Sequence, residues 1–354
     1  MSQADTIFKN TCLDIINNGI DTTGESVRAT WADTNEPAYT IKKFGVVNRY
    51  NLQKEFPAIT MRPTSIKAAA DELLWIWQKK SNNVNDLNSH IWDSWADAEG
   101  SIGKAYGYQI GKTYAHHHLN DYPTAEVFAE LKEYPSSKVV FKDDSYWVLL
   151  DQIDGVIWDL KHNPFSRRIM TNIYNFEDLH DMNLYPCAYS MTFNVTRDKE
   201  DGRLTLNGIL NQRSQDMLTA GNWNVVQYAI LIMMLAKVCD MYPGELVHVI
   251  ADCHIYDRHI PIVKTMIEKY AELIVNSDER FKSMIDSYDT REYNRTELII
   301  RESCMNPKFY DLPHPNPKFW INPDIHNFYD FTVNDFKLID YEYEPFDYKI
   351  PVAI

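Results

Sequence analysis

Residues 184–228 constrain the fold more than any other stretch, because they contain two strand patterns joined by a polar turn. A two-residue alternation of apolar and more polar side chains is typical of a strand with one buried face. The first strand carries this alternation at Cys187, Tyr189, Met191, Phe193 and Val195, and the second at Leu204, Leu206 and Leu210. The polar run 197–202 between them has the composition of a turn. We predict a hairpin with Cys187 at one outer end and Gln212-Arg213-Ser214 at the other.

The composition allows a large folded core and restricts the ligands. Of 354 residues, 45% are hydrophobic, which is ample for one large domain or two. The formal net charge of −15 repels polyanions, so we expect no binding to bulk nucleic acid. Any phosphate group must therefore be held by a local cluster of arginines.

The N-terminal residues lack a basic leader with an apolar core, and no window reaches the length of a membrane span. We expect a soluble cytoplasmic protein without a membrane partner. The five cysteines are scattered and form no Cys-x-x-Cys pair. This spacing predicts reduced thiols and indicates neither a disulfide framework nor a structural zinc site.

Apolar residues recur with helical spacing in several segments. We predict helices over residues 1–20, 65–80, 152–161 and 225–239, and a strand over 245–251 that runs into Asp252–His259. His116-His117-His118 suggests a metal site at first sight. Three consecutive histidines cannot all face one ion, so we expect a solvated loop there and no metal.

Some charged residues have two interpretations from the sequence alone. Glu72 is either a rim residue of its helix or a partly desolvated carboxyl with a raised pKa that is suited to proton transfer. Arg28, in a segment rich in turn formers, and the pair Arg167-Arg168 after a proline turn are either surface charges or phosphate ligands.

Taken together, the motifs are more specific than any one of them. In chain order they include Phe44-Gly45, Glu72-Leu73-Leu74-Trp75, Trp92-Asp93-x-Trp95, Ala105-Tyr106-Gly107, Ser166-Arg167-Arg168, Pro186-Cys187, Gln212-Arg213-Ser214-x-Asp216, Asn222-x-Asn224, Asp252-x-His254-x-Tyr256-x-x-His259 and Pro351-Val352-Ala353-Ile354. This ordered set resembles the thymidylate synthase family. The resemblance covers nearly the whole chain as a single domain, 1–354, with probable insertions near 117–142 and 270–316.

The resemblance implies an α+β fold with a large mixed β-sheet and a homodimer joined through its sheets. It also implies reductive methylation of dUMP to dTMP, with 5,10-methylenetetrahydrofolate as co-substrate and dihydrofolate as product. Cys187 is then the nucleophile, since a thiolate must attack carbon 6 of uracil to make carbon 5 nucleophilic. Nearby positive charge, with Arg213 as the candidate, is expected to lower the pKa of this thiol.

The remaining roles also follow from the resemblance. Asn224 reads the pyrimidine edge, because an amide both donates to oxygen 4 and accepts from N3–H, whereas an aspartate favours cytosine. The residues with a catalytic role are Cys187, Glu72, Tyr106, Asn224 and Asp216. The nucleotide-binding residues are Arg28, Arg167, Arg168, Gln212, Arg213, Ser214, Asn224, His254 and Tyr256, with Arg167 and Arg168 supplied by the partner subunit. The folate-binding residues are Arg62, Ile91, Trp92, Trp95, Asp216 and Ala353.

Four positions depart from the family pattern. Ala188 stands where many members have histidine, Ala220 where a glycine is usual, Trp223 where phenylalanine is usual, and Arg62 where a lysine is expected. Two alternatives therefore accompany the synthase. One is a dUMP hydroxymethylase that uses the same folate, and the other is a regulator that binds nucleotide or RNA without catalysis.

Overall fold

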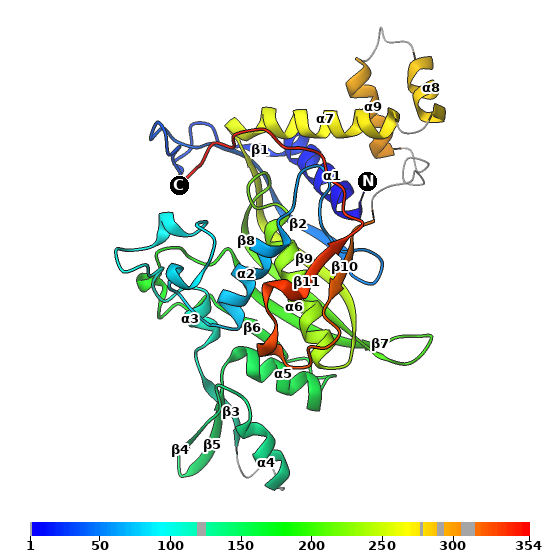
Figure 1. Ribbon diagram of the computed structural model, residues 1–354. Helices are drawn as coiled ribbons and strands as arrows, with labels where there is room; N and C mark the ends of the chain where they lie inside the picture. The colour runs from blue at the N-terminus through cyan, green and yellow to red at the C-terminus, as the bar shows by residue number, and fades with distance from the viewer. Residues whose placement is uncertain (1, 119–124, 277–278, 289–293, 306–315) are drawn as a thin grey trace.

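A six-stranded sheet forms the centre of the computed structural model, which describes residues 2–118, 125–276, 279–288, 294–305 and 316–354 (Figure 1). Its strand order is β1-β2-β9-β8-β7-β6. The strands are β1 (Ile20–Asp21), β2 (Thr40–Asn51), β6 (Met170–Asn172), β7 (Ala188–Arg197), β8 (Leu204–Asp216) and β9 (Tyr242–Tyr256). Strands β8 and β9 are parallel and the other neighbours are antiparallel. The predicted α+β fold with a mixed sheet is confirmed.

The predicted hairpin is the β7–β8 pair, in which Phe193 lies opposite Gly208 and Arg197 opposite Leu204. From Met191 onward the buried side chains of β7 alternate as predicted, but a register shift between Ala188 and Ser190 breaks the predicted alternation at Tyr189. Cys187 immediately precedes β7, and Arg213 N–H donates to its carbonyl oxygen at 2.9 Å. The pairing therefore brings the two outer ends of the hairpin together.

Two predicted helices cover one face of this sheet. Helix α6 (Trp223–Val238) is apolar nearly all round and packs on β8 and β9. Helix α2 (Ile66–Trp77) begins after Ser65, whose hydroxyl accepts from Ala68 N–H, and packs on α6. The two helices form the layer that holds Glu72 and Asn224 above the hairpin.

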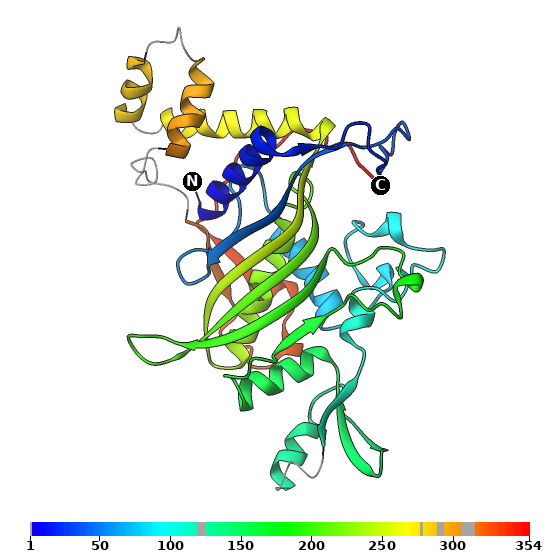
Figure 2. The ribbon, with the colours of Figure 1, turned by 180° about the vertical axis from the view of Figure 1, so that it is seen from behind.

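The opposite face of the sheet is turned toward the viewer in Figure 2, where β2, β9, β8 and β7 lie in front of α6. Apolar side chains on these strands are exposed in the single chain, among them Phe44, Val47 and Ile209. The register places Val47 opposite Val249 and Ile209 beside Val247, so apolar residues of neighbouring strands adjoin. This sheet face is therefore a candidate surface for a second subunit.

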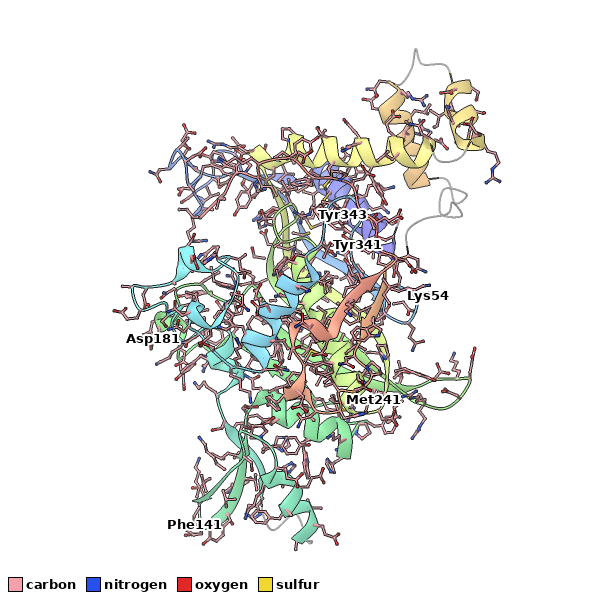
Figure 3. The ribbon with its side chains drawn as sticks, viewed as in Figure 1. Lys54, Phe141, Asp181, Met241, Tyr341 and Tyr343 are labelled. Carbon is pink, nitrogen blue, oxygen red and sulfur yellow. The ribbon has the colours of Figure 1, made fainter. Side chains whose placement is uncertain are left out.

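A separate three-stranded sheet, in the order β3-β5-β4, projects from one end of the molecule (Figure 1). Its elements are β3 (Tyr114–His118), α4 (Ala125–Lys132), β4 (Lys138–Lys142) and β5 (Ser145–Leu150), and α5 (Gln152–His162) follows it. Phe141 lies near the far tip of this lobe (Figure 3). The lobe includes most of the predicted insertion 117–142, of which 119–124 lie outside the described residues.

The expectation of a solvated loop at the three histidines is wrong. They are the last residues of β3, and the side chain of His116 is only 7% exposed. The sequence misled us because histidine is compatible with both environments, whereas the pairing of β3 with β5 is a long-range contact.

The rest of the chain surrounds the sheet. Helix α1 (Gln3–Asn18) packs on β2, and the short helix α3 (Gly107–Ile110) packs on α2. Beyond β9 come α7 (Ile260–Asn276), α8 (Glu279–Ser287), α9 (Arg295–Met305), β10 (Lys318–Ile321) and β11 (Phe336–Ile339). The predicted insertion 270–316 falls on these helices, and parts of it lie outside the described residues. Among the described helices, none combines the length and the apolar character needed to cross a membrane.

The C-terminal residues return to the loop that precedes β2 (Figure 1). Thr30 and Ile354 exchange backbone hydrogen bonds of 2.9 Å, and Ala32 N–H donates to Val352 at 2.9 Å. This pairing holds Ala353 close to the segment that carries Arg28.

Candidate active site

A cavity of about 490 Å³ lies between the outer ends of the β7–β8 hairpin and helices α2 and α6. Most of the predicted site residues line it, although they come from positions 28 to 353 of the sequence. They are Arg28, Glu72, Ile91, Trp92, Trp95, Tyr106, Cys187, Gln212, Arg213, Ser214, Asp216, Asn224, His254, Tyr256 and Ala353. Only the tertiary fold assembles this set, because no segment contains more than a few of them.

Cys187 lies half-buried in this cavity and faces a guanidinium group. Arg213 Nη2 lies 3.7 Å from its Sγ, and the same side chain is fixed by hydrogen bonds to the carbonyls of Tyr185 (2.7 Å) and Pro186 (3.0 Å). Burial raises the pKa of the Cys187 thiol above its ordinary value, and the charges of Arg213 and Arg28 oppose that rise. The expected effect of Arg213 is present, but burial outweighs it in the free protein.

Tyr106 closes the cavity beside the cysteine. Its hydroxyl oxygen accepts from Cys187 N–H at 3.3 Å. Its φ of 45° lies in the left-handed region, which costs free energy for a residue with a Cβ. Tyr106 thus contacts the nucleophile's backbone from a strained conformation, and helix α3 begins at the next residue.

Glu72 is fully enclosed, which decides between the two interpretations left open by the sequence. Trp92 Nε1–H donates to one carboxylate oxygen at 3.1 Å, and Trp223 Nε1–H donates to the other at 2.6 Å. Burial raises the pKa of Glu72, while the hydrogen bonds from Trp223, Trp92 and Gln227 oppose the rise. The carboxyl is thus buried and oriented, and its pKa lies above the ordinary value for glutamate.

Asn224 stands at the start of α6 and is held by two neighbouring amides. Gln212 Nε2 donates to its Oδ1 at 3.4 Å, and its own Nδ2 donates to Gln227 Oε1 at 3.4 Å. His248 Nε2 lies 2.8 Å from Gln212 Oε1 and so fixes that glutamine from behind. The Asn224 amide therefore has one orientation in which to meet a ligand.

His254 and Tyr256 lie two residues apart on β9 and share a face, as expected for an extended strand. His254 Nδ1 lies 2.7 Å from Asp252 Oδ1, and the rings of His254 and Tyr256 are 5.1 Å apart. Burial raises the pKa of Tyr256 to about 12, so its hydroxyl stays protonated and can donate. Both side chains offer polar groups to the cavity.

Asp216 ends β8 and caps the turn before α6. Its carboxylate accepts from Leu218 N–H (3.0 Å), Thr219 N–H (3.2 Å) and the Thr219 hydroxyl (2.6 Å). Burial raises the pKa of Asp216, but His259, 3.6 Å away, the Thr219 hydroxyl and the charge of His254 lower it below its ordinary value. Asp216 is thus an ionised acceptor on the cavity wall at neutral pH.

Comparison with known proteins agrees with this arrangement. The family model described as thymidylate synthase matches residues 6–302. The chain belongs to the thymidylate synthase family. The resemblance drawn from the sequence motifs is therefore confirmed, as are the methyltransferase class of enzyme and the conversion of dUMP to dTMP that the family implies.

Relatives match over nearly the whole length. Thymidylate synthase 1 of Bacillus subtilis strain 168 is 34% identical over 346 residues, which are 97% of this chain and 96% of the relative. Thymidylate synthase of Bacillus phage phi3T shows the same identity and coverage. A solved structure, thermostable thymidylate synthase A from Bacillus subtilis, superposes with a TM-score of 0.71 at 32% identity and covers 99% of both chains.

Three of the residues that the family resemblance pointed to do not line the cavity. Arg167 and Arg168 are exposed in the turn between α5 and β6, and they are the two that we assigned to the partner subunit's site. Arg62 lies above the Phe346 ring at 5.9 Å and is not among the lining residues. Its guanidinium still interacts electrostatically with Asp216.

Several contributors to this thymidylate synthase-type site were not predicted from the sequence. Gln227 and Tyr228 line the cavity one turn beyond Asn224 on α6, and Trp223 donates a hydrogen bond to Glu72. The signal that was available is helical spacing: residues three and four positions after Asn224 face the same side. The contact between Trp223 and Glu72 joins two helices, and no local sequence pattern predicts it.

Proposed function

We propose that this protein methylates dUMP to dTMP with 5,10-methylenetetrahydrofolate and releases dihydrofolate. The observation that carries the proposal is the shared cavity in which Cys187, Arg213, Asn224 and Glu72 meet. A nucleophile, a cation, an amide for the base and a buried carboxyl are what a covalent reaction on a uracil ring requires.

Binding of the nucleotide would use the charged and polar end of the cavity. Arg28, Arg213 and Ser214 line the cavity and would hold a phosphate dianion, and Arg167 and Arg168 of a second subunit would complete its neutralisation. His254 and Tyr256 would hold the sugar hydroxyl. The oriented amide of Asn224 would donate to oxygen 4 of uracil and accept from N3–H.

The covalent step follows from this placement. The Cys187 thiolate would attack carbon 6 of uracil, forming a carbon–sulfur bond and moving the electron pair of the ring double bond toward carbon 5 and oxygen 4. Because burial keeps the pKa of the free thiol high, deprotonation would accompany nucleotide binding, when the arginines are fixed around the site. Glu72 would move protons to and from the base after carbon 5 has reacted.

The apolar end of the cavity fits a flat reduced folate. Ile91, Trp92, Trp95 and Ala353 line it together with ionised Asp216, which can accept hydrogen bonds from a pterin. When bound there, the folate supplies the one-carbon unit and the hydride. The indole walls would exclude water, which favours hydride transfer over hydration of the one-carbon intermediate.

We also infer a homodimer joined through the open face of the central sheet. The exposed Phe44, Val47 and Ile209 support this choice, because a second sheet would bury them. The exposed position of Arg167 and Arg168 outside their own cavity agrees with a role in the partner's site. The free thiols of Cys12, Cys187, Cys239 and Cys253 support a cytosolic location.

One assay tests the proposed reaction. Purified protein with dUMP and methylenetetrahydrofolate should yield dTMP and an equal amount of dihydrofolate, seen as rising absorbance, and Cys187→Ser should abolish both. A hydroxymethylated product without dihydrofolate would overturn the proposal in favour of the hydroxymethylase. The absence of any turnover, with nucleotide binding retained, would favour a regulator.

A further inference from the structure

A second group of reactive side chains lies outside the catalytic cavity, where the outlying sheet meets helix α5. His116 and His117 on β3 and Asp159 on α5 each present a ligand atom, and all three atoms lie within 4.8 Å of one another. None of the three residues lines the cavity that contains Cys187. This β3–α5 cluster therefore needs an explanation of its own.

A β-bulge turns both histidines toward α5. In the pairing of β3 with β5, Ala115 lies opposite Leu149 and His117 opposite Val148, so His116 is the extra residue. In a regular strand, consecutive side chains point to opposite faces. Here the His116 and His117 rings are 3.9 Å apart, and His117 lies 5.3 Å from the Trp158 ring of α5. The objection that consecutive histidines cannot face one ion does not hold at this bulge.

Helix α5 contains a glycine where β3 approaches. A Cβ at Gly155 would overlap the Tyr114 hydroxyl and lie 2.9 Å from Cδ2 of His116. A glycine inside a helix costs about 1 kcal/mol relative to alanine, so its presence indicates that close approach is needed here. The missing side chain lets the His116 ring lie against α5, next to Asp159.

The buried imidazole of His116 is incompletely paired. Its side chain is 7% exposed, and its Nδ1 has no hydrogen-bond partner among the described residues. Its Nε2 lies 3.6 Å from Asp159 Oδ1, longer than a hydrogen bond. Two ligand atoms that share a tetrahedral zinc ion, each about 2.0–2.1 Å from the metal, lie about 3.4 Å apart. The gap is thus of the size that a bridging ion spans.

We propose that His116, His117 and Asp159 bind one divalent transition-metal ion, with zinc as the best match. Two imidazole nitrogens and one carboxylate are a zinc donor set, and a water molecule would complete the tetrahedron. Because such an ion would join β3 to α5, we expect it to stabilise the outlying lobe. The core of the outlying lobe consists of Leu131, Val148, Leu150 and Trp158, and so small a core gains from a metal cross-link to the helix beside it.

Cobalt(II) is a suitable probe because tetrahedral Co²⁺ absorbs visible light. The test uses the full-length chain after chelator treatment, with Cys187→Ser in every sample so that the catalytic thiol does not bind the probe. The protein with only Cys187→Ser, the parent in this test, should take up one equivalent of Co²⁺. Zn²⁺ should displace the bound Co²⁺. Asp159→Asn and His116→Gln should each weaken binding at least about tenfold. His118→Gln is the matched control, as it changes the next histidine of the same strand and should bind like the parent.

Asp159→Asn keeps the size of the side chain, so its far-UV circular dichroism should match the parent and separate lost binding from lost folding. Zn²⁺ should also raise the Tm of the parent and of His118→Gln, but not that of Asp159→Asn. Failure of the parent to take up either ion at low micromolar concentration would overturn the proposal. Equal binding by the parent, Asp159→Asn and His116→Gln would do the same.

Discussion

Trp223 Nε1–H donates to Glu72 Oε2 at 2.6 Å, and this hydrogen bond joins the start of α6 to the middle of α2. The other carboxylate oxygen accepts from Trp92, so two indoles hold the buried carboxyl from both sides. Both contacts favour the ionised form and oppose the effect of burial on the pKa of Glu72. Trp223 therefore positions the carboxyl.

Trp223→Phe should impair catalysis more than nucleotide binding. A hydrogen bond to a charged group contributes about 1.5–3 kcal/mol, so kcat should fall at least about tenfold. Loss of a donor to the carboxylate raises the pKa of Glu72 further. The inflection that the ionisation of Glu72 causes in the pH profile of kcat should therefore move to higher pH. Trp95→Phe is the control, because this indole lines the same cavity without a described bond to Glu72. Identical pH profiles for the two variants would contradict the role of Trp223.

Alkylation of Cys187 in the free protein should depend on pH. Since burial raises the pKa of this thiol above its ordinary value, the thiol form dominates at neutral pH, and the rate of iodoacetamide labelling should rise as the pH increases. Removal of a neighbouring cation raises the pKa further, so Arg213→Gln should slow labelling at pH 8. Arg28→Gln should slow it less, because the charge of Arg28 has a smaller effect. Peptide mass spectrometry measures each rate, and a constant rate from pH 6 to pH 8 would show that the thiol is already ionised.

Asn224→Asp should shift the preference from dUMP toward dCMP. A protonated aspartate accepts from the amino group of cytosine and donates to its N3, whereas the asparagine amide complements uracil. The ratio of kcat/KM for the two nucleotides measures the shift. Unchanged selectivity in a folded variant would mean that another group reads the base.

Mixing two inactive variants tests whether the site is shared between subunits. Arg167→Ala and Cys187→Ser proteins should regain activity when they exchange subunits, because one of the two sites in each hybrid has both residues intact. Equal mixing should restore about a quarter of the parent activity. Subunit exchange is followed with differently tagged chains. No recovery despite proven exchange would place Arg167 outside the partner's site.

Local patterns were sufficient for the regular elements. Alternation predicted β7 and β8, and helical spacing predicted α2 and α6, because each pattern reports which side of the element faces the core. The motifs were enough to identify the family, since they preserve the order of reactive residues along the chain. Cys187 was placed correctly at the start of its strand, within one residue.

Long-range contacts decided the rest. Glu72 had two interpretations until the indoles of Trp92 and Trp223, 20 and 151 residues away along the chain, were seen to enclose it. His116 and His117 seemed unable to share a ligand until the pairing with β5 introduced a bulge. The sequence determines which side chains are available and the period at which apolar residues recur within each segment. Burial, strand register and contacts between distant segments depend on tertiary packing. These three features determine the pKa values and the geometry of the catalytic cavity and of the proposed β3–α5 metal site.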